Sequence, residues 1–284
     1  MSRAEDIRQV AIEHHHRVAG RFEAEYAALE NSRFSSAFTY GRAKIDQLVD
    51  QLFQALPRDA AILDVGCGTG EHLKRALGHG LKATGIEPAP AMLAAARRGV
   101  PDARIEDGVA TSLPFRDGEL DAVIMIEVLR YLDRSDINLA LREARRVLRP
   151  GGKLLVTLVN RWALDGFYLH QRARQLVKRS GYNPTNPFCL FHTPGSAKRL
   201  LEQAGFTNVI TEGRLFGPIR IVYKINETLG RRVARAIEGF DDWLHGVRWA
   251  QPLAGHLIAI GEVPQGSRKT SRRSGSGRRS SKSK

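Results

Sequence analysis

Apolar runs of strand length alternate with helical patterns between residues 61 and 158 of this 284-residue chain, and no other feature of the sequence limits its fold as strongly. We expect strands at 61–65, 81–86, 103–106, 120–126 and 153–158, and helices at 71–77, 89–98 and 136–148. This alternation is typical of βαβ units and of a parallel sheet. Because such crossovers are right-handed, the sheet should be doubly wound, with its ligand crevice at the carboxyl ends of the strands.

Further elements are predicted on both sides of this core. Residues 2–56 have the pattern of two or more helices, and the stretch 44–56 is amphipathic. After the core we expect helices at 164–179, 193–204 and 225–244, and strands at 206–212 and 256–262. The predicted fold class is therefore α/β, with a doubly wound, mostly parallel seven-stranded sheet, a helical N-terminal segment and helical insertions.

Length and composition predict one main domain with additions. We expect an N-terminal helical cap over residues 1–56, a main domain over 57–263 with insertions at about 162–205 and 213–255 that form a lid, and a disordered basic tail over 264–284. The last twenty residues hold eight of the 44 Lys and Arg residues and no acid, which leaves 36 against 30 Asp and Glu elsewhere. Non-specific contact with polyanions is therefore expected mainly from the tail.

Two cysteines, Cys67 and Cys189, are too few for a disulfide framework and lack the spacing of a zinc or redox motif. The N-terminal stretch has no uninterrupted apolar run of the kind found in secretory signals, and no segment approaches the roughly 18 apolar residues of a membrane span. We therefore expect a cytoplasmic protein without a transmembrane segment and without a bound metal.

The strongest motif is LDVGCGTG, residues 63–70, at the turn from the first strand into the first helix of the core. Glycines at Gly66, Gly68 and Gly70 allow a tight turn and close approach of a ligand, while the helix N-terminus offers amide donors. A strand-to-helix turn also needs glycine for purely structural reasons. Glu87 ends the second strand, 17 residues after Gly70, where a carboxylate can accept hydrogen bonds from both ribose hydroxyls of an adenosine-containing cofactor.

Five segments in order, LDVGCGTG, GIEPAPAMLAAAR, GVATSLPF, LDAVIMIEVLRYL and LRPGGKLLV, resemble the successive motifs of class I S-adenosylmethionine-dependent methyltransferases. A weaker similarity continues in HTPGSAKRLLEQAGFTNV, and the whole is closest in type to the small-molecule, type 11-like branch. The resemblance implies that the chain is an enzyme with S-adenosyl-L-methionine as its cofactor. It leaves the acceptor open, because one fold in this family serves many substrates.

The resemblance also implies roles for individual residues. Asp64, Gly66, Cys67, Gly68 and Gly70 would lie along the methionine and ribose, and Glu87 would hold the ribose hydroxyls. Val109 and Ala110 would contact adenine through apolar and backbone groups, since many relatives have Asp where this chain has Val109; Asp107 is a possible substitute. Ile126 and Glu127 would border the methionine end and the transferred methyl group.

No catalytic base is evident from the sequence. His192 and Tyr131 are the candidates nearest the expected crevice, and a base is needed only if the acceptor must lose a proton. His14, His15 and His16 should point to different faces of a helix, where solvent exposure is an alternative to catalysis or metal binding. Tyr26, Tyr40 and Arg42 could either fold over the cofactor or only pack within the protein.

The leading hypothesis is methyl transfer to oxygen or nitrogen of a small molecule, with an anionic acceptor favoured by six Lys and Arg residues and no acid between residues 166 and 201. An RNA or other nucleic-acid methyltransferase is the main alternative, although residues 126–128 lack the Asn/Asp-Pro-Pro-aromatic motif of base amino-group methylation. A non-catalytic cofactor-binding or scaffold protein is a third. An NAD-dependent enzyme is disfavoured, because the third glycine comes one residue too early for the dinucleotide fingerprint.

Overall fold

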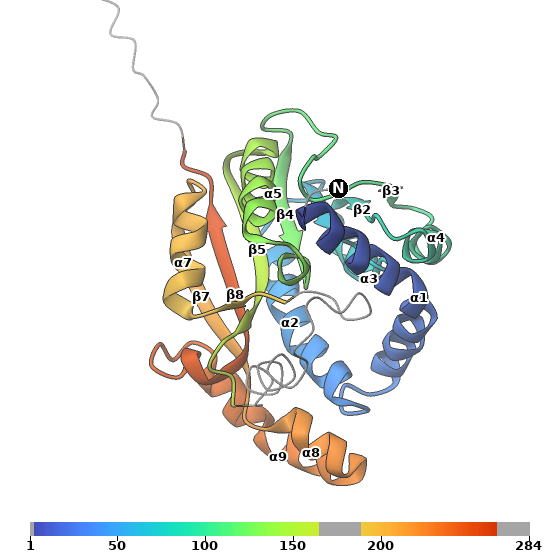
Figure 1. The fold of residues 1–284 in the computed structure, drawn as a ribbon, viewed down its shortest axis with the longest axis vertical. Coiled ribbons are helices and arrows are strands. Elements are labelled where there is room, and N and C mark those ends of the chain that lie inside the picture. Colours follow the sequence, from blue (N-terminus) through green and yellow to red (C-terminus); the bar gives the residue numbers. More distant parts are fainter. Residues whose placement is uncertain (1–2, 165–188, 266–284) are drawn as a thin grey trace, which may run out of the picture.

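A computed structural model of the chain describes residues 3–164 and 189–265, which fold around one central sheet (Figure 1). The helices are α1 (Arg3–Asn31), α2 (Ala37–Gln54), α3 (Glu71–Gly78), α4 (Pro90–Gly99), α5 (Arg134–Val147), α7 (Pro194–Gln203), α8 (Ile219–Ile225) and α9 (Glu227–Leu244), with short 3-10 helices η1 (Leu129–Tyr131) and η2 (Gln251–Leu253). The strands are β1 (Ala61–Val65), β2 (Lys82–Ile86), β3 (Arg104–Glu106), β4 (Leu120–Met125), β5 (Leu148–Asn160), β6 (Phe191–His192), β7 (Thr207–Phe216) and β8 (Ala254–Glu262). The predicted helix at 164–179 and the tail from residue 266 onward lie outside the described residues.

The predicted fold class is confirmed, and the number of strands is corrected from seven to eight. Seven strands follow the order β3-β2-β1-β4-β5-β8-β7, in which β8 runs antiparallel to both of its neighbours and the other pairs are parallel. The eighth, β6, pairs only with the end of β5, at Val159 and Asn160. A strand of two residues is too short to produce the alternation from which strands are predicted.

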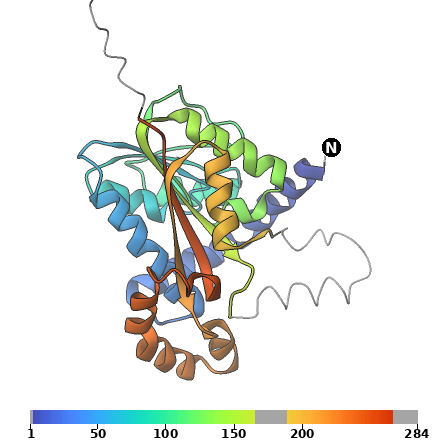
Figure 2. The ribbon, with the colours of Figure 1, turned by 90° about the vertical axis from the view of Figure 1, so that its left-hand side faces the viewer.

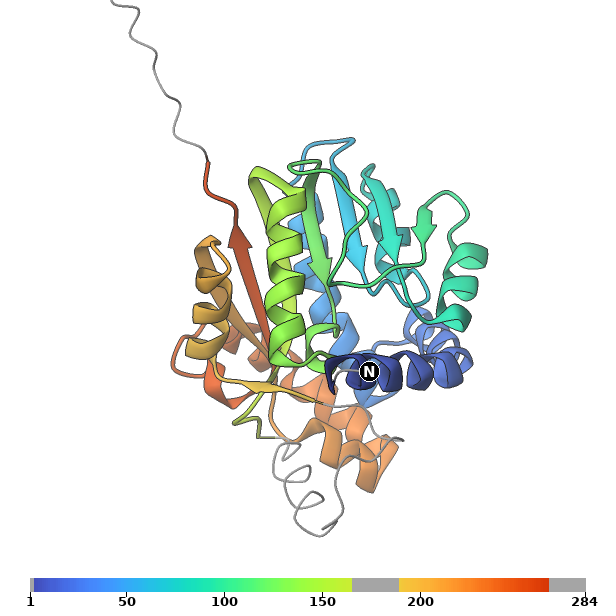
Figure 3. The same ribbon diagram turned by 45° about the horizontal axis from the view of Figure 1, so that its top comes forward.

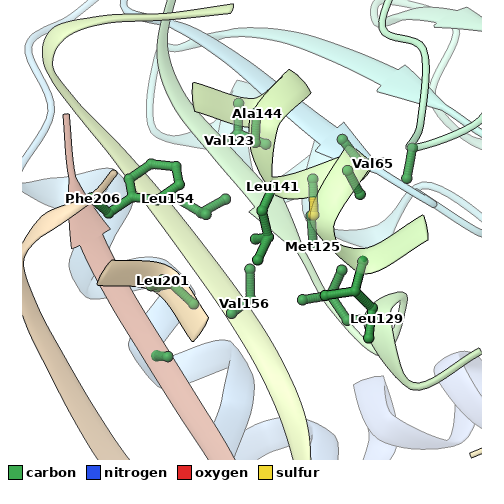
Figure 4. Packing of buried hydrophobic residues seen from close by; sticks show 14 of the residues in the cluster. Val65, Val123, Met125, Leu129, Leu141, Ala144, Leu154, Val156, Leu201 and Phe206 are labelled. Atoms are coloured by element: carbon green, nitrogen blue, oxygen red, sulfur yellow. The ribbon is translucent and has the colours of Figure 1, made fainter. Parts of the chain in front are cut away.

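Helices cover both faces of the sheet, so its central strands are buried on both sides. One face packs against α5 and α7, where Leu141 and Leu201 join one apolar cluster with Val123 of β4 and Val156 of β5 (Figure 4). The opposite face packs against α2, α3 and α4, and includes Ile124 from the same strand. Figure 2 shows the two layers, with α5 and α7 on one side of the strands and α2 on the other.

Several predicted boundaries differ from those in the structure, and hydrogen bonds explain the differences. Strand β5 begins at Leu148 rather than at residue 153, because Leu148 pairs with Leu120 of β4 and the next glycines bond to the residue after β8: Gly151 N–H donates to Val263 O, and Val263 N–H donates to Gly152 O, both at 2.9 Å. The helix expected at 225–244 is α9, which begins at Glu227 because Asn226 caps it by accepting from Leu229 N–H, whereas α8 just before it was not predicted. The helix expected at 193–204 is α7, with Thr193 as its N-cap.

The N-terminal helices and the α8–α9 pair gather at the carboxyl edge of the parallel strands. Figure 3 shows α1, the dark blue helix beside the N label, crossing beneath the arrowheads of the parallel strands. Helix α2 is tied to α9 by the fully buried Lys44, whose Nζ lies 2.7 Å from Asp242 Oδ1 and 3.2 Å from Glu238 Oε1. None of the described helices has the length and apolarity required to cross a membrane.

Candidate active site

A cavity of about 890 Å³ lies at the carboxyl ends of β1, β2 and β4, where the doubly wound sheet is expected to bind a ligand. The turns after these strands and after β3 form one side of it, and residues of α1, α2, α8, β7 and β8 also line it. The predicted site residues that line it are Gly66, Cys67, Gly68, Glu87, Val109, Ala110, Ile126, Glu127 and Tyr131. Sites for small molecules commonly enclose about 300 to 1,000 Å³, so this cavity has room for a cofactor and a second small molecule.

The turn between β1 and α3 is held by backbone hydrogen bonds and left-handed glycines. Gly66 and Cys67 both donate to Ile86 O, at 2.7 and 3.1 Å, and Gly66 and Gly68 have φ values of +72° and +57°. A Cβ atom on Gly68 would meet no described atom within 4 Å. The space beside Gly68 is therefore open to a ligand.

Gly70 has a different function in the fold from Gly68. It caps α3 with a φ of +93° and does not line the cavity. A Cβ atom there would come within 2.9 Å of Val100 Cγ2, so its small size allows the close packing of α3 against α4.

Glu87 is a buried carboxylate at the end of β2, with 6% of its surface exposed. Its Oε2 accepts from Gly68 N–H at 2.9 Å, and its Oε1 accepts from Ala89 N–H at 2.8 Å. Burial raises the pKa of Glu87 to about 7, although these two donors act in the opposite direction. Each carboxylate oxygen accepts more than one hydrogen bond, so both can still receive a ligand hydroxyl.

Asp64 lies at the end of β1 and is completely buried beneath the glycine turn, rather than among the residues that line the cavity. Neither of its oxygens has a hydrogen-bond partner among the described residues. The His72 ring lies beside it, with Nδ1 at 3.7 Å from Asp64 Oδ2, and the other ring nitrogen of His72 lies 3.0 Å from Asp46 Oδ1. A buried carboxylate without partners is costly unless a ligand donor completes it.

The loop after β3 supplies an apolar wall. Val109 and Ala110 line the cavity, and Val109 O accepts from Ser112 N–H at 3.2 Å. Asp107, the possible acidic substitute, is exposed and is not among the lining residues. This side of the cavity therefore offers contacts for a flat apolar group rather than a carboxylate.

A cluster from α1 and α2 closes the cavity above the glycine turn. The Arg42 guanidinium donates to Tyr26 Oη, and its carbon lies 5.3 Å from the Tyr26 ring centre and 5.9 Å from that of Phe38. Burial raises the pKa of Tyr26 to about 12. Arg42 Nη1 is buried and makes no hydrogen bond to the described residues, so one strong donor is unused. Tyr40, by contrast, packs against Phe34 in a separate apolar cluster.

Glu127, directly after β4, is surrounded by charged groups that the sequence did not connect to it. Its Oε1 lies 3.2 Å from His256 Nδ1, and its Oε2 lies 2.5 Å from Arg130 Nη1. Burial alone would raise the pKa of Glu127, but His256 and Arg130 hold it well below the usual range. His256 Nε2 is in turn 2.5 Å from Arg220 Nη2, and both residues line the cavity.

The remaining candidate residues are separated by the fold. Tyr131 lines the cavity, beside His15, whose ring centre is 4.8 Å away; His15 Nδ1 lies 2.7 Å from Ala11 O. His192 belongs to β6 and is not among the lining residues; burial lowers its pKa to about 4. His14 and His16 do not line the cavity either, and the described residues contain no group of three or more side chains suited to a metal.

Comparisons with known proteins agree with one another on the type of protein. A family described as a methyltransferase domain matches residues 63–156. An uncharacterized methyltransferase of Mycobacterium tuberculosis is 34% identical over 108 residues, which are 38% of this chain and 42% of that protein, so the chain spans less than half of this relative. The ubiquinone biosynthesis O-methyltransferase of Azorhizobium caulinodans is 29% identical over 168 residues, 58% of this chain and 65% of that protein. The demethylmenaquinone methyltransferase of Beutenbergia cavernae is 34% identical over 179 residues, 60% of this chain and 71% of that protein.

Solved structures have the same fold at low sequence identity. A possible histamine N-methyltransferase of Thermotoga maritima is 19% identical with a TM-score of 0.55, and the match covers 88% of this chain and 98% of that one. A putative Haloferax volcanii methyltransferase, solved with the activator Trm112, is 16% identical with a TM-score of 0.58 and the same coverage. At these identities the likeness concerns the fold alone.

Proposed function

The chain belongs to the class I S-adenosylmethionine-dependent methyltransferases, and from this premise we propose that it transfers the methyl group of that cofactor to an oxygen or nitrogen atom of a small molecule. The observation that carries the proposal is the cavity of about 890 Å³, which joins the glycine turn to a separate cluster of ionisable side chains around Glu127. Its volume fits a cofactor and an acceptor together. The apolar residues that the cavity contains suit an acceptor with an apolar body.

The residues of the cavity fit S-adenosylmethionine in three places. Open space beside Gly68 allows close approach of the ribose and methionine, and the Glu87 carboxylate can accept from the ribose hydroxyls. The unused Arg42 Nη1 matches the carboxylate of the methionine. Asp64, which was predicted to lie along the methionine, is buried beneath the glycine turn and is not among the residues that line the cavity. Val109 and Ala110 would contact adenine. All these roles are part of the proposal.

The cofactor and the protein contribute different parts of the reaction. Bound S-adenosylmethionine supplies an activated methyl group on a positively charged sulfur. The chain has to hold the acceptor atom in line with that methyl group and keep water out. Helices α1, α2 and α8, which border the cavity, are suited to this task, and we assign α8 and α9 to the lid expected between residues 213 and 255.

A nucleic-acid acceptor is the second candidate, favoured by the eight basic residues after residue 264. It stands second because residues 126–128 lack the Asn/Asp-Pro-Pro-aromatic motif of base amino-group methylation. A small acceptor can be bound by the cavity alone, without a charged groove. The two candidates predict different labelled products.

The test is to incubate the full chain with methyl-labelled cofactor and fractionated cell extract, and to follow the label. Label in the small-metabolite fraction supports the proposal, and label in RNA supports the second candidate. A Gly68→Val variant serves as the control, since it should abolish transfer without altering the charge. Cofactor binding without transfer to any fraction would contradict the proposal and favour a non-catalytic protein.

A further inference from the structure

We propose that His256, held by Glu127, is the catalytic base that accepts the proton of an acceptor hydroxyl group. The inference rests on the proposed function and deepens it, since it assigns the methylated atom to oxygen. A histidine can accept a proton only if its ring is neutral and if the nitrogen that carries the lone pair faces the acceptor. The contacts of His256 favour both.

Glu127 is held in place by its own backbone and by its neighbours. Its φ is +61°, a left-handed conformation that is uncommon for a residue with a side chain and is found preferentially at functional sites. Its N–H donates to Thr157 Oγ1 at 2.7 Å, and the same hydroxyl donates to Glu127 Oε1 at 3.2 Å. Arg130 occupies Oε2. The carboxylate therefore has little freedom to turn away from His256.

The partners of His256 define which nitrogen carries the hydrogen. Its Nε2 faces the Arg220 guanidinium, which can only donate, so Nε2 must carry the lone pair. Its Nδ1 faces Glu127 Oε1 at 3.2 Å and must carry the hydrogen. This contact is an ion-pair distance without good hydrogen-bond alignment, and such contacts commonly tighten when ligands bind.

Burial keeps the ring neutral. The His256 side chain is 5% exposed, and burial lowers its pKa, assisted by Arg220 and Arg130 and opposed by Glu127. From β7, the adjacent strand, Arg214 is the residue paired with His256, and it adds a further positive charge. His256 is therefore available as a base at neutral pH, with Glu127 ready to stabilise the cation that forms.

In the proposed step an acceptor hydroxyl takes the place of Arg220 at His256 Nε2. The O–H bond breaks and its proton passes to Nε2, while the oxygen forms a bond to the methyl carbon. The electron pair of the broken sulfur–carbon bond remains on sulfur, so charge is conserved, with one positive charge passing to the imidazole. A neutral amine would not need this base, because it already has a nucleophilic lone pair. Aromatic and aliphatic walls from Phe22, Phe38 and Leu215 favour a phenol-like acceptor.

The test compares two phenols that differ in acidity. The hydroxyl of para-cresol is protonated near neutral pH, whereas para-nitrophenol is largely ionised under mildly alkaline conditions and needs no base. We expect His256→Gln to lower kcat for methylation of para-cresol on the order of 100-fold or more, and that of para-nitrophenol by less than about tenfold. Glu127→Gln should give the same selective pattern as a positioning residue, and His192→Gln, outside the cavity, should change neither rate.

Nitrogen NMR of the imidazole provides a readout that does not depend on turnover. With S-adenosylhomocysteine bound, His256 should be the neutral form with hydrogen on Nδ1, and Glu127→Gln should convert it to a mixture of the two neutral forms. Equal losses with both phenols would overturn the proposal, since His256 would then only position Arg220. Bound cofactor product without methylation of either phenol would overturn the hydroxyl assignment. Absence of binding by the wild-type chain would instead refute the proposed function.

Discussion

Replacing Glu87 with alanine should weaken the binding of S-adenosylmethionine and of its demethylated product by about 100-fold at neutral pH. Each hydrogen bond to a charged group contributes about 1.5 to 3 kcal/mol, so two ribose hydroxyls correspond to about 3 to 6 kcal/mol. One factor of ten in affinity is about 1.4 kcal/mol, which gives a range of about 100-fold to 10,000-fold. The pKa of Glu87 is raised to about 7, so about half of the ligand-free molecules carry a protonated carboxyl at neutral pH, which reduces the affinity only about twofold; we therefore take the lower end of the range as the expected loss.

The raised pKa of Glu87 also predicts that cofactor affinity depends on pH. Hydroxyl donors favour the ionised carboxylate, so affinity should rise by about tenfold between about pH 6 and about pH 8. The ligand-free protein should behave in the opposite way, since a pKa raised by burial stabilises the fold below the ordinary pKa of glutamate and loses that contribution as pH rises through about 7. Glu87→Gln is the matched control, because it retains one acceptor oxygen and cannot titrate.

Isothermal calorimetry across this pH range decides the matter. We expect Glu87→Gln to bind with an intermediate affinity that does not vary with pH through this group. Thermal melting of each variant serves to separate loss of the carboxylate from loosening of the turn, since Glu87 Oε2 also accepts from Gly68 N–H. Wild-type affinity in Glu87→Ala would remove this residue from the cofactor site and refute the reasoning.

Three further predictions concern other parts of the chain. Gly68→Val should fold with a cost of about 1 to 2 kcal/mol for its left-handed backbone and should lose cofactor binding. Gly70→Val should mainly lower the melting temperature, because its side chain would meet Val100. Calorimetry and thermal melting of both variants test this, and the reverse pattern would contradict it. Arg42→Met should weaken S-adenosylhomocysteine about tenfold or more while leaving adenosine, which has no carboxylate, unaffected; equal losses for both ligands would contradict the assignment of Arg42. Truncation after Gln265 should leave the melting temperature and the cofactor affinity unchanged, and should reduce a salt-sensitive affinity for RNA. Loss of turnover in the truncated chain would instead favour an acceptor that the tail delivers.

Local patterns were enough to predict the sheet and the glycine turn. The bounds of β1 were predicted correctly at Ala61–Val65, and Glu87 was expected at the end of β2, where the structure has it. Both follow from short-range physics: buried parallel strands are continuously apolar, and a strand-to-helix turn beside a ligand requires glycine. Element ends such as the start of β5 were less well predicted, because Leu148 pairs with Leu120 of β4 and the following glycines bond to Val263, contacts that the local sequence does not indicate.

The assembly of the charged cluster was decided by tertiary structure alone. Glu127, Arg220 and His256 lie on β4, α8 and β8 or directly beside them, and nothing in their local sequence indicates that they meet. They meet because β8 inserts antiparallel between β5 and β7, which brings His256 opposite Val159 and close to the end of β4. Hydrophobic periodicity reports which face of an element is buried, and not which distant element covers it. The sequence therefore identifies a methyltransferase-type core, while the contacts that select an acceptor depend on strand order and helix packing.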